Sequence, residues 1–153
     1  MDLIFWRHAE AEDGHDGMAD LDRPLTPRGE KQAARMGAWL DRHLLDGTRV
    51  LCSPALRCQQ TALALGRKFK LRDELAPGTL PEGLLEAVQW PGARHPVLVV
   101  GHQPALGETI AQLLRMPDGN CAIRKGAVWW LRTRERDGHQ QTLLWAVQSP
   151  ETV

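Results

Sequence analysis

The stretch "LIFWRHAEAE", residues 3–12, sets four apolar residues directly before Arg7 and His8. An apolar run this short predicts a strand buried on both faces, as strands are in a parallel sheet. The polar segment that follows, residues 9–24, is rich in Asp and Gly and predicts a loop. Arg7 and His8 are therefore placed at the carboxyl end of a strand, which is where open α/β sheets bind ligands.

The rest of the chain alternates between strand and helix patterns. Further strands are predicted at residues 49–52 and, from the apolar run "PVLVV", at 96–100, with a short extended segment at 70–75. Helices are indicated by caps, prolines and apolar stripes at Thr26–Pro27, Ser53–Pro54, Pro81 and Leu106–Leu113. Residues 127–133 and 142–147 predict an antiparallel hairpin that turns around Asp137–Gly138. Together these patterns predict an α/β sandwich with a mostly parallel sheet and a C-terminal hairpin.

Composition narrows the class of protein. The 153 residues are enough for one domain, which we expect to span residues 1–153. Nineteen basic residues balance nineteen acidic ones, so we expect neither a nucleic-acid partner nor a membrane partner. The chain has no apolar stretch near the ~20 residues of a membrane span, and its start lacks a signal-peptide pattern. Three cysteines, an odd number, favour free thiols and a cytoplasmic location.

Polar residues follow three of the predicted strands. Arg7–His8 follows the first, the segment from Ser53 to Arg57 follows the second, and Gly101–His102 follows "PVLVV". Because the carboxyl ends of parallel strands meet at one edge of a sheet, we expect these three clusters to lie close together. A helix that starts near Pro54 would also present its N-terminal N–H groups to this edge.

The residue types in these clusters favour phosphate chemistry. Arg7 and Arg57 provide fork-shaped cationic donors that match phosphate oxygens. Guanidinium groups disfavour protonation of neighbouring rings, so we expect His8 and His102 to have lowered pKa values. A neutral imidazole is a nucleophile, whereas an imidazolium is not. We therefore predict a phosphate site in which Arg7 keeps His8 neutral and holds the phosphate that His8 attacks.

Four segments together resemble the histidine phosphatase superfamily and, within it, the SixA-type phosphohistidine phosphatases. They are "WRHAEAE" at 6–12, "RPLTPRGEKQA" at 23–33, "LCSPALRCQQTA" at 51–62 and "VVGHQP" at 99–104. The resemblance implies a three-layer α/β/α sandwich like that of phosphoglycerate mutase. It also implies that His8 is the catalytic nucleophile and becomes phosphorylated, while Arg7, Arg57 and His102 bind and polarise the phosphoryl group. It implies no metal and no other cofactor.

The sequence departs from the superfamily pattern at two positions. Ala9 stands where Arg-His-Gly is the commonest opening, and Ala is common in the SixA-type branch. Mutase-like members carry an acidic proton donor after the third strand, but here Pro77 stands at that place. Glu74 is the nearest carboxylate and is the candidate proton donor. The Asp-rich loop that contains Asp13, Asp16, Asp20 and Asp22 is a second candidate source.

A site in which no general acid is identified favours phosphohistidine over a phosphate ester as the substrate. Breaking a phosphate ester expels an alkoxide, and a general acid speeds this step ~10²–10⁴-fold. Breaking phosphohistidine expels an imidazole, which leaves readily once its other nitrogen is protonated. The prediction is therefore a metal-independent protein phosphohistidine phosphatase that acts on a signalling or phosphotransfer protein and binds phosphate or other oxyanions.

Two alternatives remain at this point, and two others are disfavoured. A small phosphomonoesterase of broad specificity would use the same residues. A non-catalytic phosphate-binding or phosphoprotein-binding module would keep Arg7 and Arg57 but would need no nucleophile. A thiol phosphatase is disfavoured because only four residues separate Cys52 from Arg57, one fewer than in the Cys-x5-Arg pattern. Zinc is disfavoured because the six histidines show no close ligand spacing.

Overall fold

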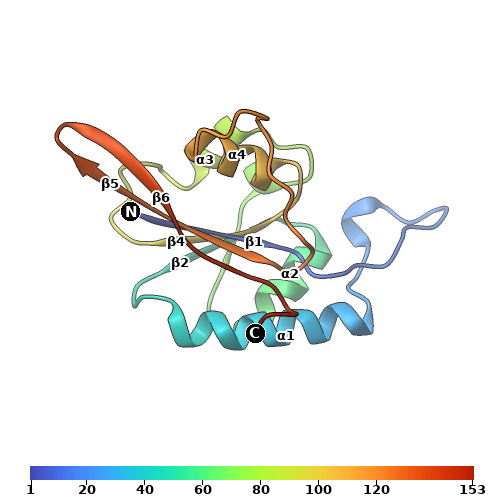
Figure 1. Ribbon diagram of the computed structural model, residues 1–153. Helices are drawn as coiled ribbons and strands as arrows, with labels where there is room; N and C mark the ends of the chain where they lie inside the picture. Colours follow the sequence, from blue (N-terminus) through green and yellow to red (C-terminus); the bar gives the residue numbers. More distant parts are fainter.

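The computed structural model describes all residues, 1–153, and centres on one six-stranded sheet (Figure 1). The strand order is β3-β2-β4-β1-β5-β6. The strands span Asp2–Arg7 (β1), Arg49–Cys52 (β2), Lys70–Leu71 (β3), Val97–Gly101 (β4), Val128–Arg136 (β5) and His139–Gln148 (β6). Strands β1 to β4 are parallel to one another, and β5 runs antiparallel to both of its neighbours, β1 and β6. This confirms the mostly parallel sheet with a C-terminal hairpin.

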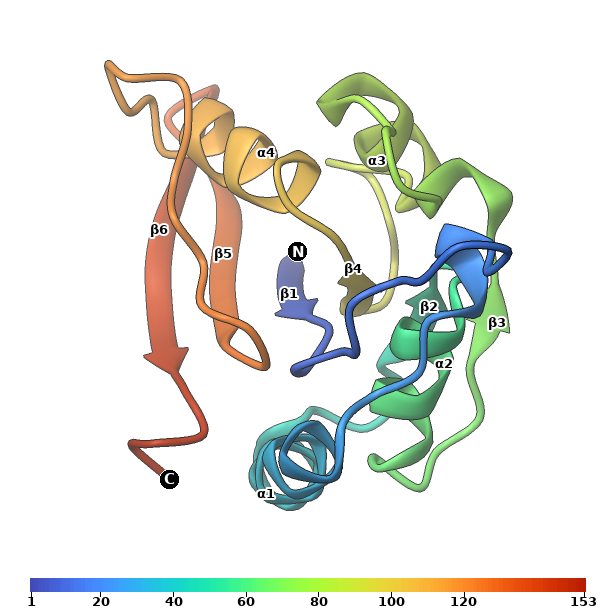
Figure 2. The same ribbon diagram turned by 90° about the vertical axis from the view of Figure 1, so that its right-hand side faces the viewer.

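Helices cover both faces of the sheet, which confirms the three-layer sandwich (Figure 2). They span Pro27–His43 (α1), Leu56–Leu63 (α2), Pro81–Ala87 (α3) and Ala105–Leu113 (α4), with 3₁₀ turns at Asp20–Asp22 (η1) and Asp73–Leu75 (η2). Successive side chains of a strand point to opposite faces of the sheet, so the hydrophobic core consists of two parts, one under each helix layer. Leu3 and Phe5 of β1 pack with α3 and α4, whereas Ile4 and Trp6 pack with α1 and α2. The apolar run of β1 is therefore buried on both faces, as its sequence predicts.

The start of α1 lies directly against the loop after β1. The side chain of Thr26 accepts a hydrogen bond from the backbone N–H of Gly29 and caps the helix, as predicted. A Cβ atom on Gly29 would lie only 2.0 Å from the carbonyl oxygen of Glu10, so this position requires glycine. The close approach fixes the segment that follows His8 against the first turn of α1.

Three local predictions need correction or extension. Only Lys70–Leu71 of the extended segment forms a strand, and η2 follows it. Helix α2 begins at Leu56 rather than at Pro54, with Ala55 at the N-cap, while the Ser53 hydroxyl bonds both His102 and the backbone N–H of Ala55. The hairpin strands are longer than predicted, and Asp137 and Gly138 both adopt positive φ angles, as a type I′ turn requires. No helix has the length and apolar character that crossing a membrane demands.

Candidate active site

The strand register brings the three polar clusters together. Arg7 of β1 pairs with Gly101 of β4, and Cys52 of β2 pairs with Val100 of the same strand. The residues that come next, His8, Ser53 and His102, therefore leave three neighbouring strands at one edge. The rings of His8 and His102 have centroids 5.4 Å apart. The structure thus places all four predicted phosphate-binding residues, Arg7, His8, Arg57 and His102, in one cluster.

His8 is held as a neutral ring with one nitrogen free. Its Nδ1 lies 2.7 Å from the carbonyl oxygen of Ala9, so Nδ1 carries the proton and donates it, which leaves the lone pair on Nε2. Burial first, and then the guanidiniums of Arg57 and Arg7, lower the pKa of His8 to about 4 against the opposing effect of the hydrogen bond to Ala9. The sequence predicted the direction of this shift but assigned it to charge, whereas burial is the larger cause.

His102 is neutral for the same reasons. Its Nδ1 lies 3.4 Å from Nη2 of Arg57, which has only protons to offer, so Nδ1 accepts. The proton of the ring is then on Nε2, which lies 2.7 Å from the hydroxyl of Ser53 and donates to it. Burial first, and then His8 and Arg57, lower the pKa of His102 to about 3.

The two arginines are anchored by carbonyl oxygens and keep unpaired donors. Nη1 of Arg7 donates to Ile123 at 2.7 Å, and Nη1 of Arg57 donates to the backbone oxygen of Asp20 at 2.8 Å. The Nε–H groups of Arg7 and Arg57 are buried and have no hydrogen-bond partner. Buried unpaired donors are uncommon because each one costs about 1–3 kcal/mol. Two of them in one cluster indicate a site that is built for an acceptor-rich ligand.

Several supporting residues were missed from the sequence. Thr61 accepts from the backbone N–H of Ala9 at 3.1 Å and donates to the carbonyl oxygen of Arg57 at 2.7 Å, which links the loop after β1 to α2. Gly126 donates its N–H to the carbonyl oxygen of His8. Thr61 follows Arg57 by four residues on a helix, and this spacing was a usable signal. Gly126 belongs to a distant loop and gave none.

Glu74, the candidate proton donor, is not joined to the cluster. It lies in η2, is exposed, and pairs with Nε of Arg72 at 3.0 Å. No hydrogen bond connects it to His8, Arg57 or His102. The carboxylate that does reach the cluster is Asp20, whose Oδ2 lies 3.1 Å from Nη2 of Arg57.

The cysteines do not provide a thiolate. Cys52 and Cys58 are free and buried, and burial raises the pKa of Cys58 to about 12 and that of Cys52 further still. A thiol protonated at neutral pH is a poor nucleophile, which argues against the thiol phosphatase alternative. The structure contains no group of three or more His, Cys, Asp or Glu side chains arranged to hold a metal ion.

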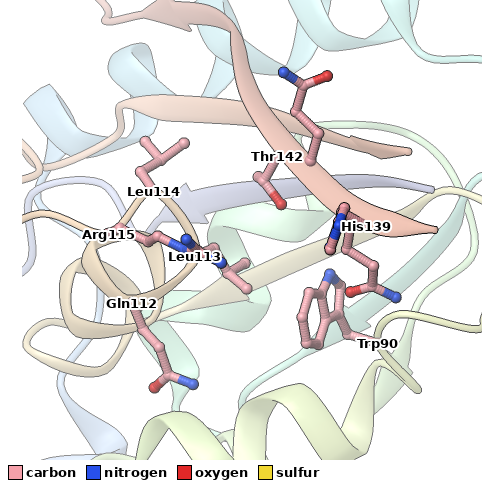
Figure 3. Close-up of a pocket in the computed structure, with 9 residues that line it drawn as sticks. Trp90, Gln112, Leu113, Leu114, Arg115, His139 and Thr142 are labelled. Atoms are coloured by element: carbon pink, nitrogen blue, oxygen red, sulfur yellow. The ribbon is translucent and has the colours of Figure 1, made fainter. Parts of the chain in front are cut away.

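A separate hollow of about 490 Å³ lies at the other end of the sheet (Figure 3). Trp90, the end of α4 and the start of β6 form its walls. Thr142, one of its residues, pairs with Thr133, which bonds Met1 at the start of β1. The length of β1, roughly 20 Å at ~3.3 Å per residue, therefore separates this hollow from His8. None of the predicted site residues lines it.

The two buried histidines predict acid sensitivity of the fold. The unfolded chain binds a proton on each histidine near pH 6.5, whereas the folded chain does so only near pH 4 for His8 and pH 3 for His102. Between these values the unfolded state binds more protons than the folded state. The contribution of the two histidines to the free energy of unfolding is therefore fully present above pH 6.5 and is lost as the pH falls. By pH 5 each histidine should cost about 2 kcal/mol of the free energy of unfolding.

Urea unfolding of the wild type and of His8→Gln at pH 7, 6 and 5 measures this effect. The variant lacks one of the two histidines, so its stability should decline about half as steeply over this range. Equal slopes for the two proteins would show that His8 does not titrate as its burial requires.

Comparison with known proteins agrees with the geometry. Residues 3–82 match the family model of the histidine phosphatase superfamily, branch 1. A SixA homolog of Haemophilus influenzae, a phosphohistidine phosphatase by name, is 36% identical over 74% of this chain and 77% of its own. A SixA structure from Nakamurella multipartitia has a TM-score of 0.81 at 31% identity and covers 97% of this chain and 95% of that one. A SixA structure complexed with tungstate has a TM-score of 0.78 at 26% identity, covering 98% and 97%.

The chain therefore belongs to the histidine phosphatase superfamily, and it is a phosphatase. Within the superfamily it is of the SixA type, since the sequence relative and both solved structures described above carry that name.

Proposed function

We propose that residues 1–153 act as one histidine phosphatase domain that removes phosphoryl groups from phosphohistidine on a signalling or phosphotransfer protein. The observation that carries this proposal is the pairing of two guanidiniums, each with a buried and unpaired Nε–H, with a neutral His8 whose Nε2 is free. The guanidiniums fit a phosphoryl group, and the free nitrogen fits the role of its acceptor.

The first step transfers the phosphoryl group to His8. The Nε2 lone pair attacks phosphorus, the P–N bond of the substrate breaks, and its electron pair stays on the departing ring nitrogen. The hydrogen bond from Nδ1 of His8 to Ala9 then stabilises the positive charge that the His8 ring acquires. Arg7 and Arg57 neutralise charge on the phosphoryl oxygens, and His102 lies next to Arg57 with its ring centroid 5.4 Å from that of His8.

The second step releases phosphate. A water oxygen attacks the phosphorus on His8, the new P–N bond breaks, and its electron pair returns to Nε2. The protons of the water leave with the phosphate or pass to solvent. His8 is then neutral again, with its Nδ1 proton still donated to Ala9. No step in this sequence requires a metal ion, so we expect activity to survive an excess of chelator.

Two considerations support phosphohistidine as the substrate rather than a phosphate ester. The departing imidazole needs little protonation, and Glu74, the carboxylate that an ester would require as acid, is exposed and bonded to Arg72. The sequence relative is a phosphohistidine phosphatase by name, and tungstate, a tetrahedral oxyanion, is bound in a SixA structure. We expect tungstate, vanadate and phosphate to bind this chain between His8, Arg57 and His102.

Relative rates on three substrates test the proposal. We expect kcat/KM to be highest for a phosphohistidine-bearing transfer protein, lower for an aryl phosphate and lowest for an alkyl phosphate, because the need for an acid increases in that order. Equal rates on the alkyl phosphate and the phosphohistidine protein would favour a broad phosphomonoesterase. Oxyanion binding without turnover of any of the three would favour a non-catalytic module.

A further inference from the structure

Asp20 lies at the site without a role in the steps above. Its carboxylate is shared by two guanidiniums: Oδ2 lies 3.1 Å from Nη2 of Arg57, and Oδ1 lies 3.0 Å from Nε of Arg23. Its backbone oxygen accepts a second bond from Arg57. The loop after β1 carries Asp20 back over α2, against which η1 packs (Figure 2). Since Nη2 of Arg57 also lies 3.4 Å from His102, only one guanidinium nitrogen separates the Asp20 carboxylate from the histidine pair.

The carboxylate of Asp20 faces outward while the arginine beneath it is buried. The side chain of Asp20 is 58% exposed, whereas that of Arg57 is 4% exposed. A phosphoryl group bound by Arg57 would therefore lie close to this exposed carboxylate. A carboxylate offers about four acceptor positions, and the two arginines use two of them. The remaining positions are open to a donor on the substrate.

The ionisation of Asp20 suits it to accept a proton rather than to donate one. Slight burial would raise the pKa of this carboxyl, but hydrogen bonds from Arg57 and Arg23 outweigh that effect and lower it below the usual value. The group is therefore an anion at neutral pH. An anion that holds no proton cannot be the general acid that an ester substrate would need.

We propose that Asp20 determines specificity for phosphohistidine by accepting a hydrogen bond from the ring N–H of the substrate imidazole. The inference rests on the proposed phosphohistidine phosphatase function. The ring nitrogen opposite the phosphoryl group must carry a proton if the ring is to depart as neutral imidazole. Asp20 keeps that proton in place: the P–N bond breaks, its electrons stay on the departing nitrogen, and the proton remains on the other one. A phosphate ester has no N–H at this position and gains nothing from the carboxylate.

The test compares two small substrates, phosphoimidazole and p-nitrophenyl phosphate, on the wild type, Asp20→Asn and Asp22→Asn. Asp22 makes no side-chain hydrogen bond and lies on the same 3₁₀ turn, so its variant carries the same charge change outside the site. A hydrogen bond between charged groups corresponds to roughly a tenfold to hundredfold change in kcat/KM. We expect Asp20→Asn to lose about that much on phosphoimidazole and less than about threefold on p-nitrophenyl phosphate.

A pH profile separates this role from a merely structural one. Because the carboxylate favours the protonated ring, the wild type should keep its phosphoimidazole activity to higher pH than Asp20→Asn does. Asp20→Glu retains the charge and should keep the substrate preference. Equal losses on both substrates would mean that Asp20 only positions Arg57, and no loss on either would mean that it does not act; each result would overturn the inference. A wild type that turned over p-nitrophenyl phosphate but not phosphoimidazole would refute the proposed function, and this inference with it.

Discussion

Replacing His8 with alanine should reduce turnover of phosphohistidine substrates at least about a thousandfold, because no other group in the cluster offers a free nitrogen lone pair to phosphorus. The Nδ1 atom of His102 faces Arg57, and its Nε2 atom bonds Ser53. The wild type incubated with a labelled phosphohistidine protein should also acquire an acid-labile, alkali-stable phosphoryl group. The His8→Ala protein should acquire none.

Oxyanion binding separates a lost nucleophile from a lost fold. The guanidiniums of Arg7 and Arg57 remain in His8→Ala, so tungstate should still bind and should still raise the unfolding temperature. The substitution removes the hydrogen bond to Ala9 and the packing of one buried ring, so the free energy of unfolding at pH 7 should fall by about 2 kcal/mol. A variant that folds normally and retains more than about 1% of the activity would show that another residue is the nucleophile.

Replacing Arg57 with glutamine should lower kcat/KM about 10²–10⁴-fold and abolish tungstate binding at millimolar concentration. Arg57 can give a phosphoryl group two charge-assisted hydrogen bonds, worth roughly 1.5–3 kcal/mol each. The substitution also leaves the Asp20 carboxylate without one of its two cationic partners, so like charge would repel an anionic substrate. Steady-state kinetics and calorimetric titration with tungstate measure the two effects.

Two further variants make the result specific. Arg67→Gln removes an arginine that also bonds a carboxylate, Asp41 at 3.1 Å, but on the surface, and it should leave kcat/KM unchanged. Arg57→Lys keeps the charge but not the planar fork and should recover only part of the activity. Full recovery with lysine would mean that charge alone, rather than paired donors, binds the phosphoryl group.

The sequence was sufficient to predict that Arg7, His8, Arg57 and His102 lie close together, because three of them stand at or directly after the ends of strands. Once β1, β2 and β4 are recognised as parallel neighbours, Arg7, His8 and His102 must share an edge. Arg57 was predictable because it lies on the first turn of the helix after β2. The prediction depended on element order and not on any detail of packing.

Residues on irregular segments were harder to place. Asp20 is one of four aspartates in a polar loop, and nothing in the spacing distinguishes it from Asp13, Asp16 or Asp22; only the return of the loop over α2 does. Glu74 was predicted as the proton donor because it is the carboxylate nearest to Pro77 in the sequence. In the structure it lies in η2 and pairs with Arg72 instead. The start of α2 was misplaced because Ser53 stands two residues before the N-cap, Ala55, where its hydroxyl bonds His102 and the N–H of Ala55.

The position of β1 between β4 and β5 has a consequence for how the protein is made. Residues 3–82, the part that matches the family model, include β1 but neither of the strands that pair with it. On the ribosome, the first strand to emerge must wait about ninety residues for β4 and about thirty more for β5. Arg7 and His8 therefore reach their final places only when the last third of the chain has been synthesised, and a nascent chain that stops short of β5 carries the phosphatase motif without a working site.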